Sequence, residues 1–246
     1  MLQQSRWRRW WHRLGRGVPA VCEACGRWPD GPLCPPCRHD LAPVVPRCPR
    51  CALPLPIGLS RCSRCIDEAP WQQVLARVDY APPWDAWIAA FKFRGRLGLA
   101  APLARLWLDD PALDALLRAS EVWLPVPSAP SRLAERGYHP VWALMQALAA
   151  QRPTPRALAQ ALRRDDTTTD QHQLGRAQRL AQGPRLFRPD VRIAAHIAGR
   201  HVLVVDDVMT TGATLRAACA ALGEAGAVTV RALVLARTPP PEPAVQ

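Results

Sequence analysis

Eight of the nine cysteines form four pairs with identical Cys-x-x-Cys spacing, all within the first 65 residues. The pairs are Cys22/Cys25, Cys34/Cys37, Cys48/Cys51 and Cys62/Cys65. A Cys-x-x-Cys turn directs two thiolates at one point, and two such turns complete a tetrahedral four-cysteine site. The four pairs therefore predict two structural zinc ions. These ions would fold the segment rather than catalyse, because protein ligands fill every coordination position.

Disulfide bonds and redox chemistry are the alternatives for these cysteines. Nothing in the sequence directs the chain to an oxidising compartment, and redox Cys-x-x-Cys motifs normally occur singly beside a β-α-β pattern. Sequential pairing is the simpler arrangement, although the sequence also allows a crossed one. It places Cys22, Cys25, Cys34 and Cys37 on one metal and Cys48, Cys51, Cys62 and Cys65 on the other. We expect a double zinc ribbon over residues 19–68, and the ninth cysteine, Cys219, as a small buried residue of a helix.

The chain of 246 residues has a net charge of +12, and residues 1–70 contribute half of it with 11 arginines against 5 acidic residues. Such an excess favours nucleic acid or an anionic membrane surface as a partner, and a general preference for arginine explains it equally well. No apolar run reaches 18 residues, which argues against a transmembrane segment. The N-terminus lacks the apolar region of a signal peptide, so we expect a cytoplasmic protein.

A basic amphipathic segment is predicted at residues 1–18. Trp7, Trp10, Trp11 and Leu14 have the spacing of one helix face, and arginines cover much of the remainder. This helix would either lie on a membrane or nucleic acid, or dock its tryptophans on the chain's own zinc ribbons.

Strand and helix patterns alternate from about residue 71 to residue 237. Strands are predicted at 121–127, 201–205 and 228–236, and helices at 140–150 and 212–226. The order strand–helix–strand over 201–236 predicts a parallel sheet covered by helices. We therefore expect an α/β domain over 71–237 and a disordered tail at 238–246.

The stretch VLVVDDVMTTGATL (202–215) joins a buried strand to a helix. Its two acids, Asp206 and Asp207, follow the apolar run where parallel sheets bind ligands, at the carboxyl end of a strand. The next turn is formed by Thr210, Thr211, Gly212, Ala213 and Thr214. Backbone N–H groups at a helix start, hydroxyls and a glycine make a cradle for an anion. Carboxylates accept hydrogen bonds from hydroxyls or bind Mg²⁺ through water, so a sugar phosphate satisfies both halves, whereas a capped helix alone does not explain the acids.

Residues 202–214 also resemble the thirteen-residue signature of the type I phosphoribosyltransferases. The resemblance implies that Asp206 and Asp207 bind the ribose hydroxyls of phosphoribosyl pyrophosphate (PRPP) and act in catalysis. It further implies that Thr210–Thr214 bind the 5′-phosphate and that Mg²⁺ accompanies the pyrophosphate.

Together with the zinc ribbons, this signature resembles the ComF family of competence proteins. FKFRGR (91–96), VPSAPSRLAERGY (126–138) and TTDQHQLGRAQR (168–179) agree with that family. The implied fold is the parallel-sheet type I phosphoribosyltransferase fold behind a small double zinc ribbon. The sequence departs from the family after Tyr138, where His139 and Pro140 replace the common Asn-Gln.

Basic residues near the implied pyrophosphate are candidate anion contacts. They are Lys92, Arg132 and Arg136, for each of which a solvated surface role is the alternative. The polar stretch 163–184 is typical of a mobile lid or of an ordinary surface loop.

Three functions follow from these patterns. The first is a ComF-type PRPP-binding protein that acts with DNA-uptake machinery, including a helicase, on single-stranded DNA. The second is an active nucleobase-salvage phosphoribosyltransferase. The third is a nucleic-acid-binding zinc protein on a transferase scaffold without catalysis.

Overall fold

The computed structural model describes residues 20–28, 31–63, 65, 69–152, 155–164 and 186–240. Three predictions fall wholly or mostly outside these residues: the amphipathic segment 1–18, the lid at 163–184 and the tail at 238–246.

Five parallel strands form the central sheet in the order β1-β7-β6-β2-β3. Their bounds are β1 Gln73–Asp79, β2 Val122–Pro125, β3 Arg156–Ala157, β6 His201–Met209 and β7 Thr229–Arg237. The predicted parallel sheet is therefore confirmed. A separate antiparallel pair consists of β4 Leu162–Arg164 and β5 Phe187–Pro189.

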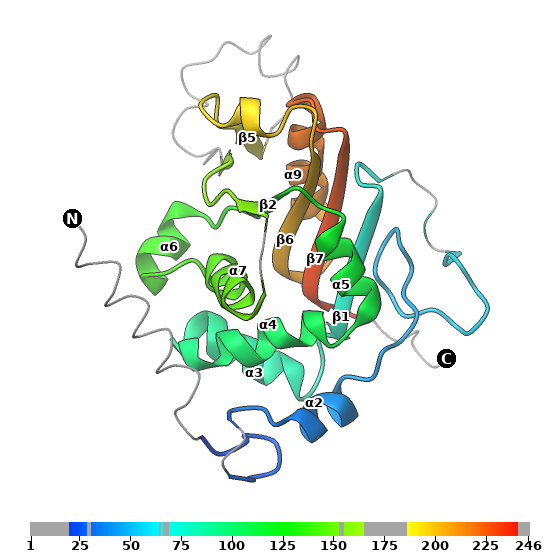
Figure 1. The fold of residues 1–246 in the computed structure, drawn as a ribbon, viewed down its shortest axis with the longest axis vertical. Helices are drawn as coiled ribbons and strands as arrows, with labels where there is room; N and C mark the ends of the chain where they lie inside the picture. The colour runs from blue at the N-terminus through cyan, green and yellow to red at the C-terminus, as the bar shows by residue number, and fades with distance from the viewer. Residues whose placement is uncertain are drawn as a thin grey trace, which may run out of the picture.

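Helices cover both faces of the sheet (Figure 1). One face carries α3 Trp84–Phe93, α4 Ala100–Leu108, α5 Pro111–Arg118 and α7 Pro140–Gln151. The other carries α9 Ala213–Glu224. Shorter helices are α2 Pro35–Leu41, η1 Leu97–Leu99, α6 Pro130–Arg136 and η2 Ala194–His196. Within the described residues, no helix has both the length and the apolar character needed to cross a bilayer.

The alternating apolar side chains of β6 explain why this strand lies between two helical layers. Leu203 and Val205 pack among α3, α4 and α7, whereas Val202 and Val204 pack against α9. Because both faces are buried, a continuous apolar run is required at this position. Cys219 of α9 is fully buried in the same layer, as predicted.

The strand order contains one switch point, between the neighbouring strands β2 and β6. From β2 the chain passes through α7 to β3, and from β6 it passes through α9 to β7 on the other side. The two connections therefore diverge, and in open α/β sheets ligands bind in the crevice that such a divergence leaves at the carboxyl ends of the strands.

The cysteine-rich segment packs into the α/β part at two places. Leu33 and Ala42 join the core on the α3–α4 face, and Ala52 joins the core on the α9 face. The division between a zinc ribbon at 19–68 and a domain at 71–237 stays a prediction, and buried contacts cross it.

Candidate functional site

Asp206 and Asp207 lie within β6, where its neighbour β2 has already ended. The last pair of β2 and β6 joins Pro125 to Val205, but the pairing of β6 with β7 continues to Met209. The strand predicted at 201–205 is thus four residues longer in the structure. Both acids therefore lie within the strand at the switch point rather than after the strand.

Asp207 is held in an ion pair with Lys92 from the last turn of α3. The Lys92 Nζ atom lies 2.9 Å from Asp207 Oδ1, and the two side chains are only 18% and 9% exposed. Low exposure strengthens their attraction and also makes an unpaired partner costly. The structure therefore brings together an acid and a base that the sequence places 115 positions apart.

Asp206 accepts the backbone N–H of Asp207 on its Oδ1 atom, at 2.9 Å. Burial raises the pKa of Asp206 above the ordinary carboxyl range, and repulsion from the Asp207 carboxylate adds to this effect. A ligand that donates hydroxyl hydrogens would relieve both penalties.

The turn from Thr210 to Thr214, here named the 210–214 turn, joins β6 to α9. Thr210 and Thr211 are exposed, and the Thr211 hydroxyl accepts the N–H of Ala213 at 3.3 Å. Gly212 has a φ of +81°, and a Cβ atom there would lie 2.6 Å from Met209 Cε. The positive φ favours glycine, and the missing Cβ leaves room for the Met209 side chain beneath the turn.

The two candidate arginines of α6 have different environments. The Arg136 guanidinium lies 4.6 Å from the ring centroid of Phe93, the residue after Lys92. Its buried Nε atom has no hydrogen-bond partner among the described residues. Arg132 instead forms an exposed ion pair with Glu135 at 3.3 Å. The structure thus brings Arg136 near Lys92 and provides no described contact between Arg132 and the acids.

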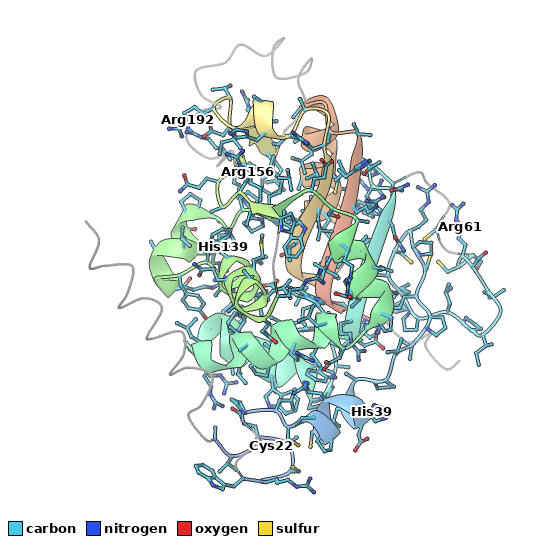
Figure 2. The ribbon with its side chains drawn as sticks, in the orientation of Figure 1. Cys22, His39, Arg61, His139, Arg156 and Arg192 are labelled. Carbon is cyan, nitrogen blue, oxygen red and sulfur yellow. The ribbon has the colours of Figure 1, made fainter. Side chains whose placement is uncertain are left out.

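His139 and Pro140, where the sequence departs from the pattern of the family it resembles, have a structural role at the start of α7. His139 precedes α7, and its Nδ1 atom accepts the backbone N–H of Trp142 at 3.3 Å, as an N-cap side chain does. Pro140 occupies the first helical position, which suits its fixed φ and missing N–H. Figure 2 shows His139 at the start of α7, close to α6.

Replacing His139 with alanine should lower the stability of the protein by about 1 kcal/mol through loss of this cap. For a domain of this size we expect the melting temperature to fall by about 2–4 °C. His139→Asn, which restores a capping acceptor, should melt close to the wild type. Equal melting temperatures for all three proteins would show that the cap contributes nothing.

The eight paired cysteines form two sets in the sequential arrangement. The first cluster is Cys22, Cys25, Cys34 and Cys37, and the second cluster is Cys48, Cys51, Cys62 and Cys65, each with all sulfur atoms within 4.8 Å of one another. All are free thiols. Figure 2 shows Cys22 and Arg61, the neighbour of Cys62, on different sides of the molecule.

The sulfur positions fit a tetrahedral zinc ion. A Zn–S bond of about 2.3 Å places two sulfurs about 3.8 Å apart. Nearest sulfur pairs lie at 3.7 Å in the first cluster and at 3.3, 3.5 and 3.8 Å in the second. Burial opposes ionisation, but backbone N–H groups outweigh it and lower the pKa of Cys22 to about 6 and that of Cys48 to about 7. Each cluster thus starts with a thiol disposed to become a metal-binding thiolate.

Sequence reasoning missed the residues that connect the clusters to the sheet. Arg237, the last residue of β7, donates from Nε to the carbonyl of Cys51 at 2.7 Å and from Nη1 to the carbonyl of Met209 at 3.1 Å. Glu23, inside the first Cys-x-x-Cys turn, pairs with Arg96 at 2.6 Å. The position of Arg237 at the end of a predicted strand was an available signal, because parallel strands end at the same edge. Glu23 carried none.

Comparisons with known proteins found similar sequences and structures. A model of the phosphoribosyl transferase domain matches residues 134–245. DNA utilization protein YhgH of Shigella flexneri is 34% identical over 179 residues, which cover 69% of this chain and 74% of that protein. The adenine phosphoribosyltransferase of Kineococcus radiotolerans is 58% identical over 43 residues, 18% of this chain and 23% of that one. The structure of the allosteric regulatory enzyme of purine biosynthesis matches 60% of this chain and 30% of that chain, with a TM-score of 0.39 and 16% identity.

Proposed function

This chain belongs to the ComF family, and we propose that it binds PRPP where β2 and β6 end and takes part in the uptake and use of DNA. The predicted fold class, a parallel-sheet phosphoribosyltransferase fold behind two four-cysteine clusters, is confirmed by the family match and the strand order. The proposal for DNA is supported by the relatives that are named DNA utilization proteins.

The observation that carries PRPP binding is the arrangement of charge around the crevice. A carboxylate pair lies beside a glycine turn that leads into a helix, and Lys92 already pairs with Asp207. The N–H groups of the turn suit the 5′-phosphate, and the carboxylates suit the ribose hydroxyls. Lys92 and Arg136 lie on the α3 and α6 side, where their positive charge would face the pyrophosphate.

In the proposed reaction, an acceptor forms a bond to the anomeric carbon of the ribose while the bond to pyrophosphate breaks. The bonding electrons leave with the pyrophosphate. Asp206 and Asp207 would orient the ribose, and the 210–214 turn would anchor its phosphate, so that positioning supplies much of the rate. The transition state would resemble an oxocarbenium ion, as in glycoside transfer.

Mg²⁺ would bind at this site together with the ligand, through the pyrophosphate oxygens of PRPP. Among the described residues, only the two cysteine clusters bring together three or more side chains that could share a metal ion. The acids of β6 would therefore need oxygen atoms of the ligand to complete a Mg²⁺ site. Mg²⁺ prefers oxygen ligands, keeps several waters and commonly binds through substrate phosphates plus one or two carboxylates. When bound, it would neutralise charge on the departing pyrophosphate.

Isothermal titration of the zinc-loaded protein with PRPP in the presence of Mg²⁺ tests the proposal. We expect saturable binding with one site per chain. A folded, zinc-loaded protein that binds neither PRPP nor ribose 5-phosphate would refute the sugar-phosphate site and leave the nucleic-acid scaffold as the better hypothesis.

Gel shift of single-stranded DNA over a series of salt concentrations tests whether the protein binds DNA directly. Binding should weaken as salt rises. A plot of the logarithm of the binding constant against the logarithm of the salt concentration should have a slope of about −0.7 per phosphate contacted. The net charge of +12 supports this expectation. If no shift occurs even at low salt, this protein does not bind single-stranded DNA directly.

A second candidate function is phosphoribosyl transfer to a nucleobase. The intact acid pair and the similarity to an adenine phosphoribosyltransferase over 43 residues favour it. Release of pyrophosphate from PRPP with one member of a panel of nucleobases would establish this activity. Binding of PRPP without release of pyrophosphate would favour the first proposal, a PRPP-binding protein that acts in the uptake and use of DNA.

A further inference from the structure

The second cysteine cluster lies directly against the part of the sheet that carries the 210–214 turn. Its first Cys-x-x-Cys loop runs through Pro49 and Arg50 to Cys51. The carbonyls of these three consecutive residues each accept a hydrogen bond from the α/β part of the chain. The donors are the Val74 N–H at 2.8 Å, the Trp71 indole N–H at 3.2 Å and Arg237 Nε at 2.7 Å.

Arg237 connects this loop with the start of the turn. Beside its bond to Cys51, its Nη1 atom donates to the carbonyls of Met209 at 3.1 Å and of Thr210. The same nitrogen donates to the carbonyl of Thr238 at 2.6 Å. A planar guanidinium makes these bonds in fixed directions, so it defines how the end of β6 lies relative to the cluster.

Trp71 makes a second connection, through packing. Its ring lies beside Gly212, since a Cβ atom added there would be 3.7 Å from Trp71 Cη2. The Arg216 guanidinium, from the first turn of α9, lies 5.5 Å from the ring centroid. One side chain therefore lies beside the glycine of the turn while its indole N–H binds the carbonyl of Arg50.

The first cluster has no contact with the 210–214 turn among the described residues. It reaches the α/β part through Glu23, which binds Arg96, and through Arg38, which binds Asp109 at 2.9 Å. Just after Cys37, the carbonyls of Leu41 and Pro43 also accept hydrogen bonds, from Trp84 Nε1 at 3.0 Å and from Arg77 Nη1 at 3.1 Å. These contacts lead to β1, α3 and α4 rather than to the turn. The two clusters are thus unequal in their relation to the site.

We propose that Arg237 and Trp71 are positioning residues that couple metal binding at the second cluster to sugar-phosphate binding at the 210–214 turn. A metal ion fixes the Cys-x-x-Cys loop, the loop fixes the three carbonyls, and the two side chains transmit that geometry to the backbone that faces the phosphate. This inference rests on the proposed function, because it assumes that the turn binds a phosphate.

Thermodynamic coupling is reciprocal, which supplies a test by metal affinity as well as by ligand affinity. Ribose 5-phosphate is the probe. When it is bound, we expect the affinity of the protein for one of its two zinc ions, measured by equilibrium competition with a chelator, to rise by a factor of about 5 or more. In Arg237→Lys, which keeps the charge but not the fork, this protection should disappear, and the affinity for ribose 5-phosphate should fall by the same factor.

Arg231→Lys is the matched control. Arg231 also lies on β7 and also binds a carbonyl, that of Ala119, but at the opposite end of the strand. It should retain both the affinity and the protection. Trp71→Phe provides an independent variant, because it removes the N–H bond to Arg50 and keeps a ring; it should reduce the protection as well.

Cysteine variants give the remaining comparison. Cys62→Ser in the second cluster should weaken ribose 5-phosphate binding more than Cys25→Ser in the first. Wild-type binding with no protection of either zinc, or with full protection in both Arg237→Lys and Trp71→Phe, would overturn the coupling and leave the sugar-phosphate site intact. Absence of ribose 5-phosphate and PRPP binding in the wild type would refute the proposed function itself and the coupling with it.

Discussion

The double variant Asp206→Asn plus Asp207→Asn should lose measurable binding of ribose 5-phosphate and PRPP. Hydrogen bonds to a charged group contribute about 1.5–3 kcal/mol each, so the loss of two raises the dissociation constant by about 100-fold or more. Calorimetry with both ligands measures the change. Retained zinc and an unchanged circular dichroism spectrum would show that the variant is folded.

The sign of this effect is diagnostic. Replacement of both carboxyls removes the Asp207 charge, which pairs with Lys92 at 2.9 Å, and so makes the crevice more positive. If charge alone governed binding, the variant would bind anions more tightly. Inorganic phosphate, which has no ribose, should therefore bind the variant at least as well as the wild type. Tighter binding of ribose 5-phosphate by the variant would contradict the assigned role of the acids.

Asp114→Asn is the matched control for this experiment. Asp114 lies in the first turn of α5 and also pairs with a cation, Arg118 at 2.9 Å. Because α5 leads into the start of β2, whereas the acids lie where β2 has ended, its loss should leave ligand binding unchanged. A similar loss of affinity in Asp114→Asn would point to general destabilisation of the protein.

The β6–α9–β7 unit could be predicted from the sequence because its signals are local. An apolar run, a turn with a glycine and a helical pattern follow one another, and the structure contains each element within a few residues of its prediction. The end of β6 was misplaced because two adjacent acids rarely extend a strand. Pairing with β7 up to Met209 overrides that preference.

Contacts between distant parts of the chain could not be predicted from the sequence. Lys92 was predicted as an anion contact from a family resemblance, but its partner Asp207 follows only from the packing of α3 beside β6. Arg237 and Cys51 are 186 positions apart, and no periodicity links them. His139 was recorded only as a departure from the family, because its capping role depends on where α7 begins.

Loss of one cysteine from either cluster should have the largest effect on stability. Cys34 lies in the first cluster, Cys48 in the second, and both are fully buried. Removal of a structural metal belongs to the changes that cost more than about 4 kcal/mol. We therefore expect Cys34→Ser and Cys48→Ser each to lower the melting temperature by at least about 8 °C. Each variant should contain one zinc ion per chain instead of two.

Cys219→Ala separates metal loss from the loss of a buried sulfur. Cys219 is as deeply buried as the other two but lies in α9, outside both clusters. Its replacement should cost only about 1 kcal/mol, the usual scale for a single substitution, and should leave two zinc ions bound. The two clusters also bind opposite faces of the sheet domain through Leu33 and Ala52, so loss of metal should expose core residues of the α/β part. If Cys34→Ser and Cys48→Ser melt no lower than Cys219→Ala, the clusters do not hold structural metal, and the metal-dependent coupling of the second cluster to the 210–214 turn fails as well.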